Sequence, residues 1–163
     1  MDFSWIYNLN HQLATLLLAM LPITELRASI PIALKTFSLP IWQAFSLSIL
    51  GSFIPAVLII YFIGPISQYF QRFKWGKKFF DWLFERTRKR FDKKYYLWGK
   101  IALLIFVAIP LPLTGVWTGS LAAWLFAFEK KQALLFIFLG TILAAVFVTL
   151  ISLGFFKIFE FLL

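Results

Sequence analysis

Residues 21–31 have the sequence L-P-I-T-E-L-R-A-S-I-P, which places two charged side chains, Glu25 and Arg27, inside an apolar run. A charged side chain at the centre of a membrane helix costs about 2.5–3.5 kcal/mol on insertion scales. Pro22 and Pro31, near the two ends of the stretch, lack the backbone N–H that a continuing helix would use. The stretch is therefore a poor membrane anchor, and it predicts a broken segment that lines a site.

The rest of the chain has the composition of an integral membrane protein. Its 163 residues are 61% hydrophobic and 14% charged, with a mean hydropathy of +0.85, whereas soluble domains carry about 25% charged residues. The stretches Ile41–Ile66 and Ala133–Phe156 contain no charged residue. Each is longer than the roughly 20 residues that a membrane helix needs, so we expect a multi-pass membrane protein.

Residue patterns that would indicate an enzyme or a metal site are missing from the sequence. Cysteine is absent, and the single histidine, His11, has no partner at metal-ligand spacing. There is no Ser/His/Asp set and no glycine-rich phosphate loop. We therefore expect no catalytic residue, no cofactor and no metal, and we interpret His11 as a polar residue at the membrane interface.

The positive charge of the chain is concentrated in one loop. Of 16 Lys and Arg residues, 11 lie between Arg72 and Lys100, which is typical of a cytoplasmic loop and argues against nucleic-acid binding. Aromatic residues recur there at helical spacing, so the loop is expected to form a basic amphipathic helix on anionic lipid, although a pure topology signal would also be basic. The residues expected at the lipid interface are Arg86, Arg88, Lys89, Lys93 and Lys94.

Four apolar blocks, at about 12–39, 41–66, 101–128 and 132–156, set the expected architecture. The second and fourth are expected to be plain spanning helices, while the first and third contain prolines, and the third also contains glycines. Because unpartnered backbone does not occur in lipid, we expect the broken blocks to form re-entrant hairpins buried in protein. The expected path for a substrate follows the uncharged residues of both: Pro22, Thr24, Pro31, Pro110, Pro112, Thr114, Gly115, Trp117, Thr118 and Gly119.

A weak internal repeat supports this arrangement. A shift of 89 residues pairs Gly51 with Gly140 and Val57 with Val146, although chance matches are common in apolar sequence. Together with the lysines at 130 and 131, the repeat predicts an all-α membrane fold of two inverted repeats, each a proline-broken re-entrant hairpin followed by a transmembrane helix. The expected units are repeat one at about 12–66, the basic interfacial linker at about 70–100 and repeat two at about 101–157, within one membrane domain, 1–163.

Glu25 and Arg27 are the residues best suited to carry a function. Burial and a nearby cation act on the pKa of a carboxyl in opposite directions, so Glu25 beside Arg27 is a candidate for taking up and releasing a proton. Arg27 offers a planar fork of donors that suits carboxylate or phosphate. Because positions i and i+2 of a regular helix do not face each other, a direct pair requires a broken backbone. A purely structural ion pair is the alternative.

The broken segments T-E-L-R-A-S-I-P-I-A-L and P-L-P-L-T-G-V-W-T-G-S-L-A-A resemble the putative small multidrug export proteins of prokaryotes over roughly residues 15–155. The most specific element is E-x-R-x-x-x-P at Glu25, Arg27 and Pro31. That family is similar to the DedA-like (VTT-domain) proteins, which implies re-entrant hairpins, proton-driven transport or recycling of polyprenyl phosphate carriers. The second hairpin lacks an arginine that such relatives often have, which weakens the case for a phospholipid substrate.

Three functions follow as hypotheses. The first is proton-coupled export of small molecules or drugs by a homodimer in a prokaryotic cytoplasmic membrane, with Glu25 carrying the proton and Arg27 assisting it or holding an anionic substrate. The second is flipping of an anionic lipid or polyprenyl phosphate carrier through Arg27. The third, of another class, is a membrane organiser that does not transport and acts through its basic loop.

Overall fold

The computed structural model describes residues 10–74, 76–78, 81, 96–111 and 114–154. All regular elements within these ranges are helical, which confirms the prediction of an all-helical chain for the described residues. The helices are α1 (His11–Met20), α2 (Glu25–Lys35), α3 (Ile41–Phe70), α5 (Tyr96–Ala108), α6 (Val116–Leu125) and α7 (Lys130–Ser152). The expected lipid-interface residues Arg86, Arg88, Lys89, Lys93 and Lys94 lie outside the described residues.

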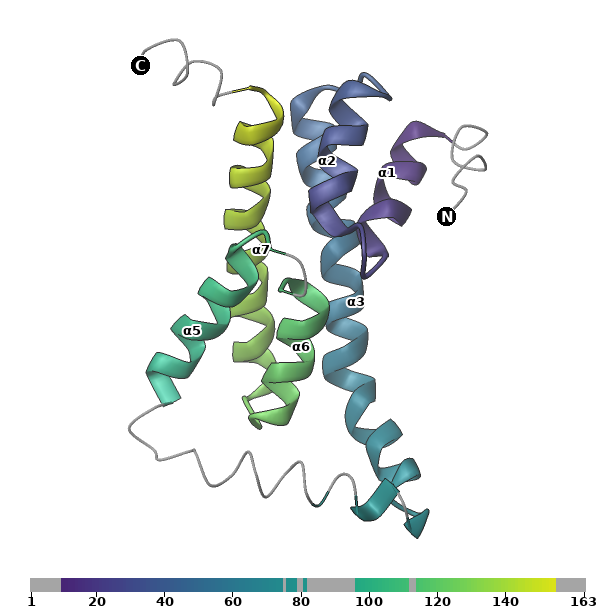
Figure 1. Cartoon of the computed structure of the whole chain (residues 1–163), viewed down its shortest axis with the longest axis vertical. Coiled ribbons are helices and arrows are strands. Elements are labelled where there is room, and N and C mark those ends of the chain that lie inside the picture. The colour runs from purple at the N-terminus through teal and green to yellow at the C-terminus, as the bar shows by residue number, and fades with distance from the viewer. Residues whose placement is uncertain (1–9, 75, 79–80, 82–95, 112–113, 155–163) are drawn as a thin grey trace.

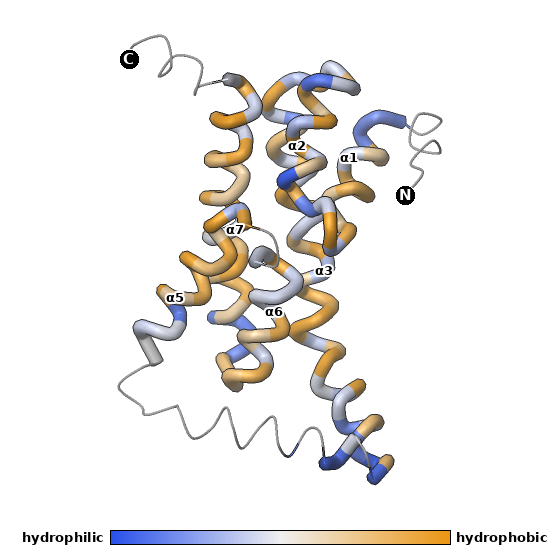
Figure 2. Tube along the Cα trace, viewed as in Figure 1, coloured by the Kyte–Doolittle hydropathy of each residue, from blue (hydrophilic) through white to orange (hydrophobic). Residues whose placement is uncertain are grey.

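Of the helices in the described residues, two are long and apolar enough to cross a membrane, and the other four are too short over their described lengths. α3 has 30 residues and α7 has 23, so at a rise of about 1.5 Å per residue they are roughly 45 and 35 Å long. The other four have 10 to 13 residues each, about half of what a bilayer requires. Figure 2 shows hydrophobic residues along most of α3 and α7, with hydrophilic residues gathered at the far end of α3.

The short helices form two antiparallel pairs whose turns meet near the middle of the molecule. In Figure 1, α1 and α2 occupy the end that contains the start of α3, while α5 and α6 occupy the opposite end. Each pair is followed along the chain by one long helix, and the two turns lie at about the same height in the view of Figure 1. This arrangement agrees with the expected pairing of hairpins, while the re-entrant and inverted-repeat assignments stay predictions.

Not every proline of the two broken blocks ends a helix. Pro22 lies in the turn between α1 and α2, and Pro110 lies in the turn after α5, two residues beyond its end. Pro31, which we expected to interrupt the segment, instead lies inside α2, where it removes one intrahelical hydrogen bond without ending the helix. The expectation that Pro31 interrupts the segment is therefore wrong. Pro112 lies outside the described residues.

Glycines allow each long helix to approach the first helix of its own pair. A Cβ added at Gly51 of α3 would overlap the backbone carbonyl of Leu16 in α1. A Cβ added at Gly140 of α7 would lie 2.8 Å from the carbonyl of Leu104 in α5. Small residues permit such close helix packing in lipid, so these two contacts fix both hairpins against α3 and α7.

Positions 89 residues apart also have similar backbone features in the two halves of the chain. α3 begins at Ile41 and α7 begins at Lys130, 89 positions later. Just before these helices, Ser38 and Ala127, which are also 89 positions apart, have positive φ angles of 52° and 54°. Together with the matching glycine contacts, this agreement supports the predicted internal repeat.

Candidate functional site

The turn between α1 and α2 buries the carboxylate of Glu25. Glu25 is the first residue of α2, and only 4% of its surface is exposed. Directly before it, Thr24 Oγ1 donates a hydrogen bond to the carbonyl of Leu18, and the Glu25 N–H donates to the carbonyl of Leu21 at 2.9 Å. Glu25 has a φ of 43°, a left-handed conformation that is uncommon for residues other than glycine.

The Glu25 carboxylate lies at the N-terminus of α6, in the other hairpin. It accepts hydrogen bonds from the backbone N–H groups of Val116 and Trp117, the first two residues of α6. The first N–H groups of a helix have no partner within the helix, and the positive end of the helix dipole favours an anion there. Glu25 therefore acts as the cap of α6 across the contact between the two hairpins.

Gly115 makes room for this carboxylate. It precedes α6 and has a φ of 120°, which side chains rarely adopt. A Cβ built on Gly115 would lie 2.9 Å from Cδ of Glu25 and would overlap one of its carboxylate oxygens. Both the backbone conformation and the space at this position therefore require glycine.

Arg27 joins the same two turns through its guanidinium group. Its Nη2 donates to the carbonyl of Thr114 at 2.5 Å and contacts Thr114 Oγ1 at 3.1 Å. The same nitrogen lies 3.9 Å from Oε2 of Glu25. An i, i+2 pair would not face each other on a regular helix, and the two groups are at the edge of ion-pair distance; the break in the backbone lies directly before Glu25, at the start of α2, where φ is positive.

A reciprocal hydrogen bond runs from the second hairpin to the first. The indole Nε1 of Trp117 donates to the carbonyl of Met20 at 3.1 Å, at the last residue of α1. A carbonyl at a helix C-terminus has no intrahelical partner, and in lipid such groups must be satisfied by protein. We call this set of interactions among Glu25, Arg27, Thr114 and Trp117, with Gly115, the turn–turn contact.

The remaining residues of the expected path have local roles in the structure. Thr118 Oγ1 donates to the carbonyl of Gly115 at 3.4 Å, within α6 and its cap. Gly119 faces α5, since an added Cβ would lie 2.6 Å from Cγ2 of Val107. Pro31 lies inside α2 and is not one of the residues that form the turn–turn contact. The structure thus brings together only part of the set that the sequence predicted.

Sequence reasoning missed the backbone partners of the charged residues and one buried side-chain pair. The Val116 N–H and the Met20 carbonyl carry no signal in the sequence, since every residue has equivalent groups. Ser29 of α2 donates to Ser48 of α3 at 2.7 Å, and both are fully buried. The signal for this pair was available, because two serines in apolar runs must find partners.

Within the described residues, no group of three or more His, Asp or Glu side chains is placed to hold a metal ion. The turn–turn contact itself offers a carboxyl group, a guanidinium group and backbone donors. It can bind and release a proton at Glu25, and it can pair an anion with Arg27.

Comparison with protein families finds a match to the family model described as "Putative small multi-drug export protein", over residues 25–147. The match begins at Glu25 and includes both halves of the turn–turn contact. No curated protein and no solved structure matches the chain. A relation to the DedA-like proteins stays a prediction. The matched region covers most of the 163 residues, and the chain therefore belongs to the putative small multidrug export protein family.

Proposed function

We propose that the protein is a small membrane exporter in which protonation of Glu25 controls the contact between the two hairpins. The family to which the chain belongs carries an export description, and the helices α3 and α7 are long and apolar enough to span a membrane. The observation that carries the proposal is the position of the Glu25 carboxylate, which caps α6 from the opposite hairpin.

In the proposed mechanism, the ionised carboxylate holds the hairpins together. Hydrogen bonds to an ionised acceptor are roughly twice as strong as neutral ones, and the charge also pairs with Arg27 and with the dipole of α6. A proton on Glu25 removes these charge-dependent interactions at once. The turn–turn contact then opens, and the hairpins separate enough to admit a substrate between them.

Release of the proton to the other side of the membrane closes the contact again. The two turns, one from each hairpin, lie near the middle of the molecule (Figure 1). In the proposed mechanism a change at their contact therefore alters access from both ends. Such alternation around a site between repeats is a common plan in transporters. A proton gradient would thereby drive the cycle in one direction.

The experiment uses the full chain in proteoliposomes under an imposed pH gradient. Proton movement is followed with pyranine trapped in the lumen, while ethidium and chloramphenicol serve as a cationic and a neutral transport probe. We expect Glu25→Gln to abolish the probe-dependent proton flux. Glu129→Gln, at an exposed acid directly before α7, is the matched control and should leave it unchanged. Normal flux in Glu25→Gln would refute proton coupling at this residue.

A second candidate, flipping of an anionic lipid or lipid phosphate carrier, is favoured by the unused donors of Arg27. Within the described residues, its hydrogen bonds come from Nη2, and 23% of its side chain is exposed. The other nitrogens of the fork are therefore able to hold an anionic head group. Arg27→Ala should abolish movement of a fluorescent phosphatidic acid between leaflets if this function holds, and unchanged movement would exclude it.

A further inference from the structure

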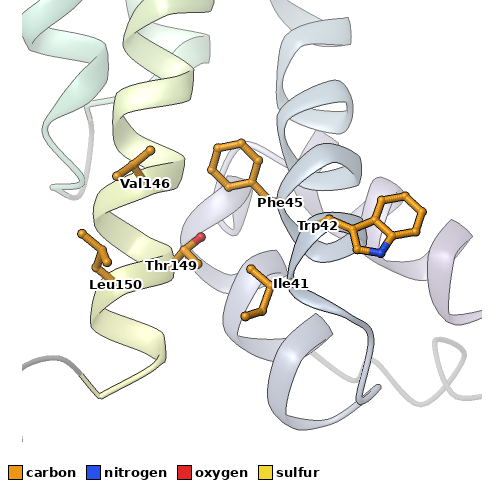
Figure 3. Close-up of a pocket in the computed structure, with 6 residues that line it drawn as sticks. All are labelled: Ile41, Trp42, Phe45, Val146, Thr149 and Leu150. Atoms are coloured by element: carbon orange, nitrogen blue, oxygen red, sulfur yellow. The ribbon is translucent and has the colours of Figure 1, made fainter.

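α3 is longer than a bilayer requires, and the excess lies at its C-terminal end. Its 30 residues extend over about 45 Å, whereas the hydrocarbon core of a bilayer is about 30 Å thick. Trp42 and Tyr61, which are 69% and 45% exposed, lie about 29 Å apart along the axis of α3, and such residues gather at the two boundaries of the hydrocarbon. Figure 3 shows the Trp42 ring on the side of α3 away from α7. The part of α3 between these two residues is therefore sufficient to span the membrane, and residues 62–70 are left beyond it.

A contact between a cation and a ring marks the same boundary on α7. Lys130 Nζ, at the first residue of α7, lies 5.1 Å from the centre of the Tyr61 ring. Glu129, Lys130 and Lys131 are all exposed, and charged side chains are costly inside hydrocarbon. α7 therefore begins at the level of Tyr61, while α3 continues through residues 62–70, roughly 14 Å further. In Figure 1 these last turns of α3 lean away from α6 and α7.

The chain beyond this boundary, residues 62–74 and 76–78, which we call the α3 extension, exposes an apolar, aromatic face. Phe62, Ile66 and Tyr69 follow one another at spacings of four and three residues, which places them on one side of α3. The face continues to Phe73, whose ring centre lies 6.1 Å from that of Tyr69. Between 47% and 58% of each of these side chains is exposed. An exposed apolar patch next to polar residues marks a surface that contacts a partner or a membrane.

Basic side chains are interleaved with this face, and Figure 2 shows hydrophilic residues gathered at this end of α3. Residues 62–78 contain no acid, and the exposed cations of the α3 extension are Arg72, Lys74, Lys77 and Lys78. The Arg72 guanidinium lies 5.8 Å from the centre of the Tyr69 ring. The Lys77 N–H donates to the carbonyl of Phe73 at 2.9 Å, so the chain turns after α3 and keeps its cations beside the aromatic residues.

We propose that the α3 extension binds the head groups of anionic phospholipids, with its aromatic side chains between the head groups and its cations on the phosphates. Basic residues combined with large apolar ones are typical of elements that lie in the membrane interface. Each cation near an anionic leaflet adds to the attraction, so a surface with cations and no acid selects anionic over zwitterionic lipid. A second copy of the same face is disfavoured as a partner, because like charges would meet.

A soluble acidic protein is the competing occupant, and membrane depth separates the two. Such a partner would also match the charge, but it would require Phe62 and Ile66 to lie in water before it binds. The α3 extension directly continues a helix that is long and apolar enough to span a membrane, so lipid is the apolar surface beside it. The inference assigns a lipid contact to the end of a helix that we expected to be plain spanning, and it does not rest on transport.

The test compares phosphatidylglycerol with phosphatidylcholine, each carrying the same photoactivatable diazirine on an acyl chain. The full chain is placed in phosphatidylcholine nanodiscs with a trace of either probe and irradiated, and the adducts are mapped by mass spectrometry. We expect the phosphatidylglycerol adducts at residues 62–73 to exceed the phosphatidylcholine adducts by about fivefold or more, fivefold being the effect of one cation near an anionic leaflet. Equal adducts of the two lipids would overturn the proposal.

Charge variants locate the site. A fourfold variant, Arg72→Gln with Lys74→Gln, Lys77→Gln and Lys78→Gln, should reduce the phosphatidylglycerol adducts at residues 62–73 to the phosphatidylcholine level. Lys35→Gln removes an exposed cation at the opposite end of the molecule, so it is the control and should leave the excess unchanged. An excess that persists in the fourfold variant would place the lipid on other basic residues and overturn the proposal.

A depth measurement keeps the test decisive if the fourfold variant does not fold. The chain contains no cysteine, so a spin label can be attached singly at Phe62→Cys, Ile66→Cys or Leu50→Cys, and its exposure to oxygen and to a water-soluble nickel chelate is compared in nanodiscs. Leu50, exposed on α3 between Trp42 and Tyr61, is the control and should report the hydrocarbon. We expect the labels at positions 62 and 66 to lie at head-group depth. Labels there that are as open to the nickel chelate as a label in water would leave the face to a soluble partner and overturn the proposal.

Discussion

Replacing Gly115 by alanine should destabilise the protein strongly, because two independent features of the turn–turn contact require glycine. The φ of 120° at Gly115 is strained for any residue with a side chain, which costs about 1–3 kcal/mol. The added Cβ would also displace the Glu25 carboxylate, since it would lie 2.9 Å from Cδ. Losing a helix cap costs about 0.5–2 kcal/mol, so the free energy of unfolding should fall by roughly 2–4 kcal/mol.

The assay is reversible unfolding of the purified chain in mixed micelles, with Gly64→Ala as the matched control. Gly64 lies within α3, and a Cβ there would meet only Trp124 Nε1, at 3.9 Å. Alanine is a better helix former than glycine by about 1 kcal/mol, so the control should be neutral or slightly stabilising. A Gly115→Ala variant as stable as Gly64→Ala would refute the reasoning.

A double variant separates the two contributions. In a Glu25→Ala background the carboxylate is gone, so Gly115→Ala should cost only the backbone strain. The two substitutions should therefore be non-additive, with a coupling free energy of about 1 kcal/mol or more. Additive effects would mean that Gly115 and Glu25 do not contact each other.

Three further predictions concern the stability of the hairpin contacts and use the same unfolding measurement. Arg27→Lys should lower the free energy of unfolding by about 1–2 kcal/mol, because the shorter lysine side chain does not reach the position of Nη2, which contacts both oxygens of Thr114; wild-type stability would contradict the assigned bond. Trp117→Phe keeps a ring but loses the bond to the Met20 carbonyl, so it should cost about 0.5–1.5 kcal/mol, and no loss would exclude this contribution. Gly140→Ala should cost about 1–3 kcal/mol through overpacking against α5, and wild-type stability would contradict this close contact between α5 and α7.

The broken segments and their charged pair were predictable from the sequence because they conflict with their surroundings. Two charges in an apolar run are costly in a plain membrane helix, and Glu25 and Arg27 do lie in the first turn of α2, directly after a break in the helical chain. The glycines at 51 and 140 were likewise visible as repeat partners. Their matching contacts with α1 and α5 explain physically why glycine is found at both positions.

The partners of the charged pair could not be predicted. Glu25 binds backbone N–H groups, and Arg27 binds a carbonyl 87 residues away along the chain. Backbone groups are the same at every position, so only the fold determines which of them are left free. Gly115 directly precedes α6, and a glycine in this proline-rich stretch was the available signal that a helix N-terminus could lie there.

The helical conformation at Pro31 could not be predicted either, for a different reason. A proline disfavours a continuing helix through the loss of one hydrogen bond and a steric clash. In α2 the helix nevertheless continues to Lys35, and its buried residues pack against α3 and α7. Tertiary packing thus outweighed the local preference, and that packing is not visible in a single stretch of sequence.

The central claim is that protonation of Glu25 opens the turn–turn contact, and the distance between the two turns tests it most directly. The chain contains no cysteine, so spin labels can be attached at Ile23→Cys and Leu111→Cys, two exposed positions on opposite turns. Distances are measured by pulsed electron paramagnetic resonance in nanodiscs at acidic and at neutral pH. The account predicts a longer and broader distance distribution at acidic pH, and the same distribution at neutral pH in Glu25→Gln. A distribution that changes with neither pH nor Glu25→Gln would contradict it.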